Sequence, residues 1–421
     1  FYNSGKYGRT AVCPDEGVRF SMHYLDNAAT TRVLPEAAEA AVHAMCEEFG
    51  NPSSLHRMGL EASHLLEDSR RTVASALGCL PEEVYFTACG TESTNISLRG
   101  TAHLNRHKKG RIITTEIEHA ATVNTAKQLA ADGFDVVFLA PDATGHITPE
   151  VLSDALTEDT ILLSCQLVNN EIGTVQPVEQ LGKLLKAKAP KALFHIDAVQ
   201  GLCRVRLTPK KWNCDLMSVS GHKIGAPKGI GALYVKKGLR LPPLTFGGGQ
   251  ERGLVSGTEN TAGCIGLAAA MKEAVEGLDE KMGYVKKLTD KLVKGIMENI
   301  PYSHYTGDPV NRLPGTASFV FEAIEGEGLI LRLDNAGVCG STGSACSTGS
   351  LDPSHVLMAI GLPHEIAHGS LRLTLGEQNT EEDVDYIIET VTDVVKTLRS
   401  MSPVWENGHP NLTAATELHA H

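Results

Sequence analysis

The stretch VYFTACG at residues 84–90, followed by TESTNISLRGTAHL at residues 91–104, indicates the fold class of this chain. Its first part is rich in residues that favour strands, and its second part has apolar residues at helical spacing. The same order returns in RIITTEIEH (111–119), which is followed by the helix-like AATVNTAKQLAADG (120–133). Strands that alternate with helices are typical of a mostly parallel sheet with helices on both faces. We therefore predict an α/β fold.

Five further strand-like runs continue this order along the chain: DVVFLAP (135–141), TILLSCQLV (160–168), ALFHIDAVQ (192–200), CDLMSVSG (214–221) and GALYVKKG (231–238). Helical connectors lie between several of these runs. In sheets of this kind, ligands bind at the carboxyl ends of the strands. Polar side chains that directly follow the runs are therefore the first candidates for a functional site.

The order of elements changes after residue 261. A long helical stretch over residues 261–299 precedes a second set of elements: the strand-like TASFVFEAI (316–324), the helix-like GEGLILRLDNAG (326–337), the strand-like SLRLTLG (370–376) and the final helix TEEDVDYIIETVTDVVKTLRSM (380–401). This set predicts a smaller α+β domain.

We divide the chain into four segments. Residues 1–21 are an N-terminal extension, native or not, and residues 22–275 form the large domain, whose first residues can pack with the small domain. Residues 276–402 form the small domain, which carries Cys346. Residues 403–421 are polar, and we expect them to be a disordered tail.

The composition argues against several classes of function. The 421-residue chain has a net charge of −12, which disfavours a nucleic-acid or anionic-membrane binder. No apolar run approaches the roughly 20 residues that a membrane span needs, and the first 21 residues lack the apolar core of a signal peptide. The 10 cysteines form no C-x-x-C pair, so we expect neither a disulfide framework nor a zinc ribbon, and we expect a cytoplasmic protein.

Two charged side chains directly follow apolar strands. Lys223 lies among glycines in SVSGHKIGAPKGIGALY (218–234), where it is either a solvated lysine in a turn or an amine for Schiff-base chemistry. Asp197 lies in HIDAVQ (195–200), where it is either a helix N-cap or the acid that keeps the ring nitrogen of a pyridine-type cofactor protonated. In the second case Gln200 would bond a ring oxygen. Neither residue alone decides between these readings.

The segment CGTESTN (89–95) opens a helix directly after a strand. Its backbone N–H groups and the helix dipole would form a phosphate site, and the same geometry allows Thr91 to be an N-cap with Glu92 in the first turn. Neither a Walker A motif nor G-x-G-x-x-G is present, which argues against a nucleotide-binding loop. His119 and Asn170 are further polar residues at the ends of predicted strands, where packing or capping is their usual role.

Cys346 lies in STGSACSTGS (341–350) with no apolar neighbour. A free cysteine is normally a small buried hydrophobe, whereas runs of serine and glycine make flexible chain. An accessible thiol in such a run is either an accident or a reactive group, and the segment alone leaves both readings open.

The segment HEIAH (364–368) matches H-E-x-x-H, the signature of zinc metalloproteases. That motif needs a long helix, which brings the two histidines to one face. Here Pro363 precedes the motif and Gly369 follows it, which leaves less than two helical turns. We therefore expect no metal site.

Taken together, five motifs resemble those of the NifS/IscS-like cysteine desulfurases, which are pyridoxal-phosphate (PLP) enzymes of the class V aminotransferase group. They are S-x-H-K at Lys223, D-A-x-Q at Asp197, G-T-E-S-x-N from Gly90, N-N-E-x-G around Asn170 and S-T-G-S-A-C-S around Cys346. The resemblance runs from about Tyr24 to about Leu398 with the motifs in matching order. It implies the fold of PLP-dependent transferases of fold type I, with PLP as the cofactor.

The resemblance also implies a role for each matching residue. Lys223 would form a Schiff base with PLP, the internal aldimine, and then move protons at the substrate Cα; His119 and Cys346 join it as catalytic residues. The expected ring contacts are Asp197 on the nitrogen, Gln200 on the hydroxyl, His119 on the face, and Asn170 on the ring oxygen or the substrate. The expected phosphate contacts are Gly90, Thr91, Ser220 and His222, with Thr258 from the neighbouring subunit of a homodimer. Arg372 would clamp the substrate carboxylate, which suits a bidentate guanidinium.

By this resemblance the protein is a cysteine desulfurase. It would convert L-cysteine to L-alanine and a persulfide on Cys346, and pass the sulfur to an acceptor or iron–sulfur scaffold protein. This transfer requires Cys346 to lie on a mobile segment. Selenocysteine lyase stays open as an alternative, as do a class V aminotransferase and a sulfur-transfer docking scaffold. One position departs from the family, which usually has an arginine where this chain has Val255.

Overall fold

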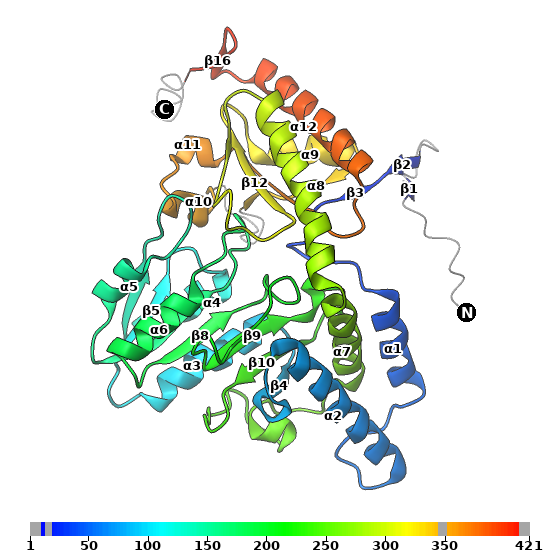
Figure 1. The fold of residues 1–421 in the computed structure, drawn as a ribbon, viewed down its shortest axis with the longest axis vertical. Helices are drawn as coiled ribbons and strands as arrows, with labels where there is room; N and C mark the ends of the chain where they lie inside the picture. The colour runs from blue at the N-terminus through cyan, green and yellow to red at the C-terminus, as the bar shows by residue number, and fades with distance from the viewer. Residues whose placement is uncertain (1–9, 13–18, 344–351, 412–421) are drawn as a thin grey trace.

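The computed structural model describes residues 10–12, 19–343 and 352–411, and its centre is a seven-stranded sheet (Figure 1). Across the sheet the strands lie in the order β4 (Val84–Thr87), β10 (Gly231–Val235), β9 (Leu216–Ser220), β8 (Leu193–Asp197), β7 (Thr160–Gln166), β5 (Arg111–Thr115) and β6 (Asp135–Leu139). β10 is antiparallel to both of its neighbours, and the other neighbouring strands are parallel. The predicted α/β fold with a mostly parallel sheet is confirmed.

Helices cover both faces of this sheet. One face packs against α3 (Gly90–Leu104) and α4 (Ala120–Ala131). The other face packs against α2 (Arg57–Leu77), α5 (Pro149–Ala155), α6 (Val178–Lys188) and α7 (Thr261–Val275), and α1 (Pro35–Cys46) packs on α7. Because both faces are buried, the central strands are nearly continuous apolar runs, which is why they could be predicted from sequence.

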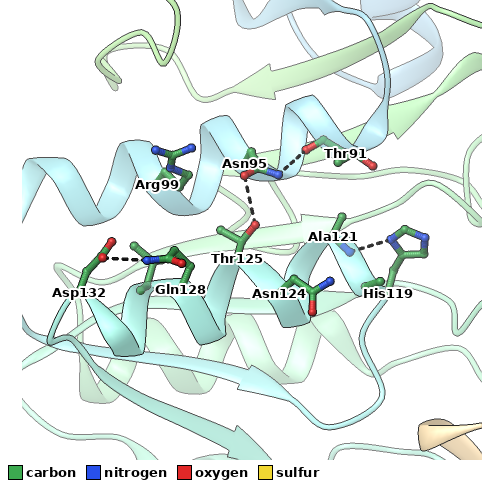
Figure 2. Close-up of a pocket in the computed structure, with 11 residues that line it drawn as sticks. Thr91, Asn95, Arg99, His119, Ala121, Asn124, Thr125, Gln128 and Asp132 are labelled. Atoms are coloured by element: carbon green, nitrogen blue, oxygen red, sulfur yellow. Dashed lines mark hydrogen bonds between the residues drawn. The ribbon is translucent and has the colours of Figure 1, made fainter. Parts of the chain in front are cut away.

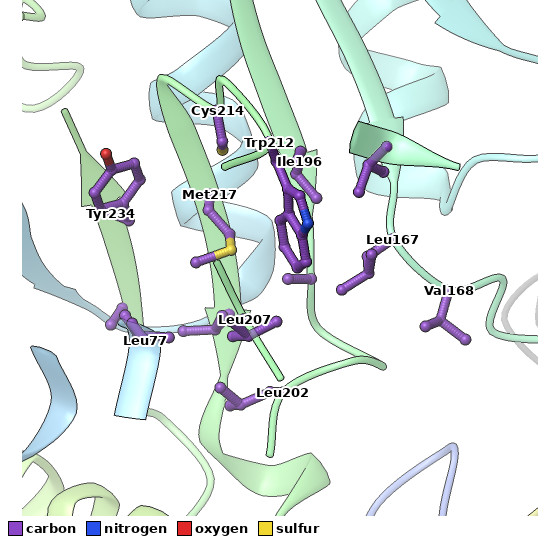
Figure 3. Close-up of a cluster of buried hydrophobic side chains, with 14 of the residues drawn as sticks. Leu77, Leu167, Val168, Ile196, Leu202, Leu207, Trp212, Cys214, Met217 and Tyr234 are labelled. Atoms are coloured by element: carbon purple, nitrogen blue, oxygen red, sulfur yellow. The ribbon is translucent and has the colours of Figure 1, made fainter. Parts of the chain in front are cut away.

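The largest apolar core lies between the sheet and the second group of helices. Figure 3 shows its centre, where Ile196 of β8 and Met217 of β9 belong to one buried cluster with Trp212. Successive side chains of a strand point to opposite faces. Since Ile196 faces this core, Asp197 points to the face that carries α3 and α4, at the carboxyl end of β8.

The helical stretch predicted over residues 261–299 is two helices, α7 and α8 (Leu278–Asn299), and the prediction of one continuous stretch is wrong at Gly277. Gly277 has a φ of 65°, in the left-handed region, where a right-handed helix cannot continue. α8 extends into the smaller domain (Figure 1). Within the described ranges, the structure contains no helix that combines the length and the apolar character needed to cross a membrane.

The smaller domain is built on a three-stranded antiparallel sheet of β11 (Ser303–Tyr305), β12 (Thr316–Phe321) and β14 (Ser370–Thr374). Its core gathers residues of this sheet, of α8, of α9 (Gly326–Asn335) and of α12 (Glu381–Met401). Two short helices of the same domain, α10 (His355–Ala359) and α11 (His364–Ala367), lie between α9 and β14 in the sequence.

The two domains share a buried apolar contact. Ile117 and Ile172 of the large domain lie in one cluster with Val320 of β12, Leu357 of α10 and Ala367 of α11. This contact lies beside the turn that carries Asn170, so it bears directly on the geometry of the candidate site.

The first residues of the predicted large domain pack with the small domain. β3 (His23–Tyr24) pairs in parallel with β13 (Val338–Cys339), and His23 Nδ1 lies 3.0 Å from Asp383 Oδ1 on α12. Further upstream, within the segment expected to be an extension, β1 (Thr10–Val12) pairs antiparallel with β2 (Arg19–Ser21).

The expectation of a disordered tail from residue 403 is wrong for residues 403–411. These residues include a hairpin of β15 (Trp405–Glu406) and β16 (His409–Pro410). The Arg399 guanidinium lies 4.3 Å from the centre of the Trp405 ring and donates hydrogen bonds to the carbonyls of Pro301 and Tyr302. A cation–π contact with Arg399 and a ring contact with Tyr302 thus hold a segment whose polar composition alone predicted disorder. Residues 412–421 lie outside the described part of the chain.

Candidate active site

Two neighbouring strands bring Asp197 and Lys223 to the same edge of the sheet. Asp197 is the last residue of β8, and Lys223 closes the short 3₁₀ turn Gly221–Lys223 that directly follows β9. β8 and β9 are parallel, so their carboxyl ends meet at one edge. Lys223 Nζ donates to the carbonyls of Ala28 at 2.6 Å and Ala29 at 2.7 Å. Gln200 Nε2 donates to the same Ala28 carbonyl at 2.9 Å, so Gln200 and Lys223 meet at one backbone oxygen.

Asp197 is a buried carboxyl in a mixed electrostatic environment. Burial raises its pKa, while the N–H of Val199, at 3.0 Å from Oδ1, and the charges of His119 and Lys223 lower it. Three residues singled out from separate motifs therefore act on one another here. The arrangement suits a carboxylate that faces a positively charged ring nitrogen.

His119 begins a helix and does not end a strand. β5 stops at Thr115, four residues earlier than predicted, and His119 is the N-cap of α4, with Nδ1 accepting from the N–H of Ala121 at 3.1 Å. The cause lies in Glu118, whose buried Oε1 accepts from the Thr115 hydroxyl at 2.8 Å and from the N–H of Gln166 at 3.0 Å. The carboxylate draws the chain out of the strand, and no local pattern predicts that.

The helix that follows β4 begins at Gly90, with Cys89 as its N-cap, so the reading of Thr91 as the N-cap is wrong. Glu92 lies in the first turn, as expected, and its Oε2 accepts from the N–H of Ala88 at 2.6 Å. A Cβ on Gly90 would lie 2.8 Å from Val199 Cγ2, which requires glycine at this close approach. The first N–H groups of α3 lie free of helical partners by geometry and carry its positive dipole end, as a phosphate site needs.

Ser220 lies beside this position at the end of β9, and His222 follows in the 3₁₀ turn. Ser220 is buried at the end of the strand, and His222 Nδ1 lies 3.2 Å from Thr30 Oγ1. Burial, together with the charges of Lys223 and Lys228, lowers the pKa of His222 to about 4, so the imidazole is neutral at neutral pH. Thr258 is exposed on the segment before α7.

Arg372 of β14 brings the small domain to the site. Its side chain is buried, Nη1 donates to the Asn170 carbonyl at 2.9 Å, and Nη2 lies 2.9 Å from Asp26 Oδ1. The buried Nε is without a hydrogen-bond partner among the residues that the structure describes. A guanidinium with an unsatisfied N–H at a domain junction suits the recognition of a carboxylate.

A groove of about 710 Å³ extends from this edge between α3 and α4 (Figure 2). Thr91 and His119 line the end of the groove that is nearest the strand edge, and Asn95 and Gln128 line its course. Asn95 Oδ1 accepts from Thr125 Oγ1 at 3.2 Å across the two helices. The groove residues outside the motifs were missed from sequence, since exposed polar positions on helices are ordinary.

The segment Asp26–Thr31, from YLDNAATT, covers the glycine-rich loop. Thr31 Oγ1 donates to the His222 carbonyl at 2.9 Å and accepts from the N–H of Gly225 at 2.7 Å. In the sequence, this segment marks only the start of the resemblance to the cysteine desulfurases. Its two alanines and two adjacent threonines were the sequence pattern that could have indicated a close approach of this backbone to Lys223.

Three other predictions have different outcomes. Cys346 lies outside the described residues, so its placement stays a prediction. Val255, where the family usually has arginine, packs against the apolar cluster around Ile96 and Leu254.

In HEIAH, α11 is only a single turn, His364–Ala367, and the short helix expected from Pro363 and Gly369 is confirmed. Within the described ranges, no group of three metal-binding side chains is present.

A buried histidine supports the sheet below Asp197. His195 Nδ1 lies 2.8 Å from Ser164 Oγ, and Nε2 lies 2.8 Å from Ser218 Oγ, which also accepts from Thr94 Oγ1 of α3 at 3.3 Å. This network joins β7, β8 and β9 to the helix that would hold the phosphate. Burial lowers the pKa of His195 to about 3, so His195 is neutral in the folded protein.

The His195 pKa predicts a pH dependence of stability. Below pH 6.5, the ordinary pKa of histidine, the unfolded chain binds one more proton at this residue than the folded chain does. The free energy of unfolding therefore decreases by up to about 1.4 kcal/mol for each unit by which the pH is lowered. The gap in unfolding free energy between wild type and His195→Gln should therefore shrink by about 1.4 kcal/mol from pH 7.5 to pH 5.5. Urea unfolding of both proteins measures this gap. A constant gap would contradict a neutral buried imidazole.

With this geometry in place, the chain can be compared with known proteins. The family model described as Aminotransferase class-V matches residues 23–387. The chain belongs to this family. It is 47% identical over 381 residues to a cysteine desulfurase IscS of Methanosarcina thermophila, covering 90% of this chain and 94% of that protein. The resemblance drawn from the five motifs is confirmed.

Solved structures of class-V aminotransferase relatives show the same fold. A NifS-like protein superposes with a TM-score of 0.84 at 40% identity, covering 90% of this chain and 100% of that chain. SspA in complex with cysteine superposes with a TM-score of 0.75 at 34% identity, covering 85% of this chain and 99% of that one. The class-V aminotransferases and the cysteine desulfurases among them are PLP-dependent enzymes.

Proposed function

We propose that this class-V aminotransferase relative is a PLP-dependent cysteine desulfurase, which converts L-cysteine to L-alanine and carries the sulfur as a persulfide on Cys346. The observation that carries the proposal is the meeting of Lys223, Asp197 and His119 at one sheet edge, with Arg372 at the adjoining domain junction. The curated relatives named cysteine desulfurase support the same reaction.

The residues at the edge fit PLP. A buried carboxyl, Asp197, suits the ring nitrogen, and the α3 N-terminus at Gly90 suits a phosphate because its first backbone N–H groups and its positive dipole end favour an anion. Gln200 would bond the ring hydroxyl and His119 would stack on the ring. Thr91, Ser220 and His222 would surround the phosphate. When bound, PLP supplies an electron sink for the negative charge left on the substrate Cα.

The chain's own residues bind the substrate and move its protons. The Arg372 guanidinium, whose Nε has no hydrogen-bond partner in the described part of the chain, would hold the substrate carboxylate, and Asn170 lies on the turn beside it. Lys223 Nζ would take the proton from the substrate Cα and return it, with His119 exchanging protons at the ring. The amine would leave the Ala28 and Ala29 carbonyls to do so.

Cys346 would act on the substrate sulfur as a thiolate. Its sulfur forms an S–S bond with the substrate sulfur, while the bond between the substrate Cβ and that sulfur breaks and its electron pair stays on carbon. Protonation of that carbon gives the methyl group of alanine. The terminal sulfur then passes to a thiol of an acceptor or iron–sulfur scaffold protein.

One assay tests this proposal. The PLP-loaded wild-type protein with L-cysteine and a thiol reductant should release alanine and sulfide in equal amounts, and Cys346→Ala should lose this release at least about 10²-fold. Cys46→Ala, which removes an exposed thiol on α1, is the matched control and should keep the rate. Absence of alanine from the PLP-loaded wild type would refute the desulfurase. Release from selenocysteine alone would indicate a selenocysteine lyase, and amino transfer to a keto acid would indicate an aminotransferase.

We also propose a homodimer. Six large apolar side chains of α1, α2 and the loop between them are exposed on the single chain: Val42, Met45, Phe49, Leu55, Met58 and Leu60. An apolar patch of this kind is typical of an interface. Thr258 would then reach the phosphate site of the neighbouring subunit. Sedimentation equilibrium should give twice the chain mass of 45.0 kDa, and a monomer mass would contradict the proposal.

A further inference from the structure

Glu171 is a buried carboxylate that the proposed mechanism does not use. It lies in the turn after β7, directly after Asn170, and only 4% of it is exposed. Asn169 Oδ1 accepts from the N–H groups of Glu171 at 2.8 Å and Ile172 at 2.9 Å, and Asn169 Nδ2 donates to the Ile117 carbonyl at 3.0 Å. The backbone of Glu171 is therefore fixed to the large domain.

The Glu171 carboxylate reaches across to the small domain. The Ser354 hydroxyl donates to Oε2, and the same hydroxyl oxygen caps α10 by accepting from the N–H groups of Val356 at 3.1 Å and Leu357 at 3.3 Å. A Cβ on Gly343 would lie 2.6 Å from that Oε2. Gly343 and Ser354 stand on either side of Cys346 in the sequence, so both sides of its segment converge on one oxygen atom.

The same junction is tied to the substrate clamp. Ser341 and Arg372 exchange two backbone hydrogen bonds, at 3.1 Å and 2.6 Å, and Arg372 Nη1 donates to the carbonyl of Asn170. Upstream of Cys346 the chain is thus paired with the strand that carries Arg372. Downstream it is held at Ser354 by the residue next to Asn170. The Glu171 carboxylate thus connects Ser354 to the turn that also contacts Arg372.

Burying this carboxylate is costly, which argues for a use. Burial raises the pKa of Glu171 to about 7, while the Ser354 hydrogen bond and the Arg372 charge lower it. An apolar residue or an amide would fill the position without that cost. A charge is useful here if it must orient the Ser354 hydroxyl and face Arg372 at the same time.

We propose that Glu171 is a positioning residue, which holds Ser354, with Gly343 packed closely beside it, next to the Arg372 clamp so that the segment between Gly343 and Ser354 presents Cys346 to the bound substrate. This inference rests on the proposed desulfurase function. It assigns to the glutamate of N-N-E-x-G a task separate from that of the adjacent Asn170. Arg372 keeps its own bonds to Asn170 and Asp26 when Glu171 is changed, so substrate binding should depend on Glu171 much less than the attack by Cys346 does.

The test compares PLP-loaded wild type with Glu171→Ala and Glu171→Gln. Glu171→Ala should lower kcat for alanine formation at least about tenfold, because misplacement of a reacting group lowers the rate of its step, while KM for L-cysteine changes less than about threefold. Glu171→Gln keeps an acceptor for the Ser354 hydroxyl but loses the charge that faces Arg372, so it should recover part of the rate. If Glu171 acted only through stability, Glu171→Ala would not lower kcat while KM stays nearly unchanged, and Glu171→Gln would not restore kcat specifically.

A second readout needs no turnover. The rate at which iodoacetamide alkylates Cys346, followed by mass spectrometry of its peptide, should rise at least about fivefold in Glu171→Ala, because the Ser354 anchor of the segment is released. Glu83→Ala is the control, since Glu83 is also buried and accepts from the N–H groups of Leu80 at 2.9 Å and Lys237 at 3.0 Å. It should leave kcat and alkylation within about twofold of wild type.

Two results would overturn the inference. One is a Glu171→Ala protein with unchanged kcat and unchanged alkylation of Cys346. The other is a parallel loss of PLP content, L-cysteine binding and kcat, which would make Glu171 a residue of general stability. If the wild type forms no alanine, the desulfurase proposal fails by itself, and the alkylation rates still decide whether Glu171 anchors the segment.

Discussion

Replacing Lys223 by alanine should lower the rate of alanine formation from L-cysteine by at least about 10³-fold. The loss is large because this one amine would both attach the cofactor and move the Cα proton. Lys223 Nζ is held at the sheet edge by the Ala28 and Ala29 carbonyls, and its charge acts on Asp197. Alanine formation by the PLP-loaded variant, measured by amino-acid analysis, checks the prediction.

The matched control is Lys228→Ala, in the same glycine-rich loop. Lys228 is exposed, so its removal should leave the rate within about twofold of wild type. Circular dichroism should show both variants folded. A Lys223→Ala protein that is folded, loaded with PLP and still within tenfold of the wild-type rate would contradict the role given to Lys223.

Replacing Glu251 by alanine should lower the free energy of unfolding by about 3–5 kcal/mol. Glu251 lies in the short 3₁₀ segment Gln250–Gly253, and its buried carboxylate pairs with both terminal nitrogens of Arg70, each at 2.8 Å. It also accepts from the N–H of Phe86 of β4 at 2.7 Å. Removal leaves Nη2 of the buried Arg70 and the N–H of Phe86 without their acceptor, while Arg70 keeps Glu67 on Nε and the Val84 carbonyl on Nη1. Removing one partner of a buried pair is the costly way to break it. Urea unfolding measures the change.

Two further variants sharpen this test. Asp68→Ala breaks the ion pair with Arg71, whose side chain is 66% exposed, and should cost less than about 1 kcal/mol. The double change Arg70→Met and Glu251→Leu removes both buried charges and should cost less than the sum of the single changes. A loss below about 1 kcal/mol for Glu251→Ala would show that this pair contributes no more than a surface pair.

The strands of the main sheet were predictable because burial on both faces makes them apolar along their length. β7, β8 and β9 lie inside the runs predicted at 160–168, 192–200 and 214–221. The end of β5 was not predictable. It depends on Glu118, whose carboxylate bonds the backbone of Gln166 on a different strand. Local pattern carries no information on that partner.

The predictions for the tail and for the long helical stretch were wrong for related reasons. Trp405 is one aromatic residue in a polar segment, and the hairpin is stabilised by its contacts with Arg399 and Tyr302, which are distant in sequence. The break at Gly277 depends on one residue with a positive φ, and glycine inside a helical pattern does not by itself reveal one. In one case a few tertiary contacts, and in the other a single dihedral angle, outweighed the composition of the neighbouring sequence.

By itself, the sequence determined the positions of the strands and the residues that bear the chemistry, because burial and motif spacing are properties of short stretches. Lys223 and Asp197 could be singled out in this way as strand-end residues in separate motifs. Only the tertiary structure decided which groups these residues meet. Lys223 bonds Ala28, which is 195 residues away, and Arg372 pairs with Asp26, which is 346 residues away. Hydrogen bonds and ion pairs depend on distances in space, and folding sets those distances independently of spacing along the chain.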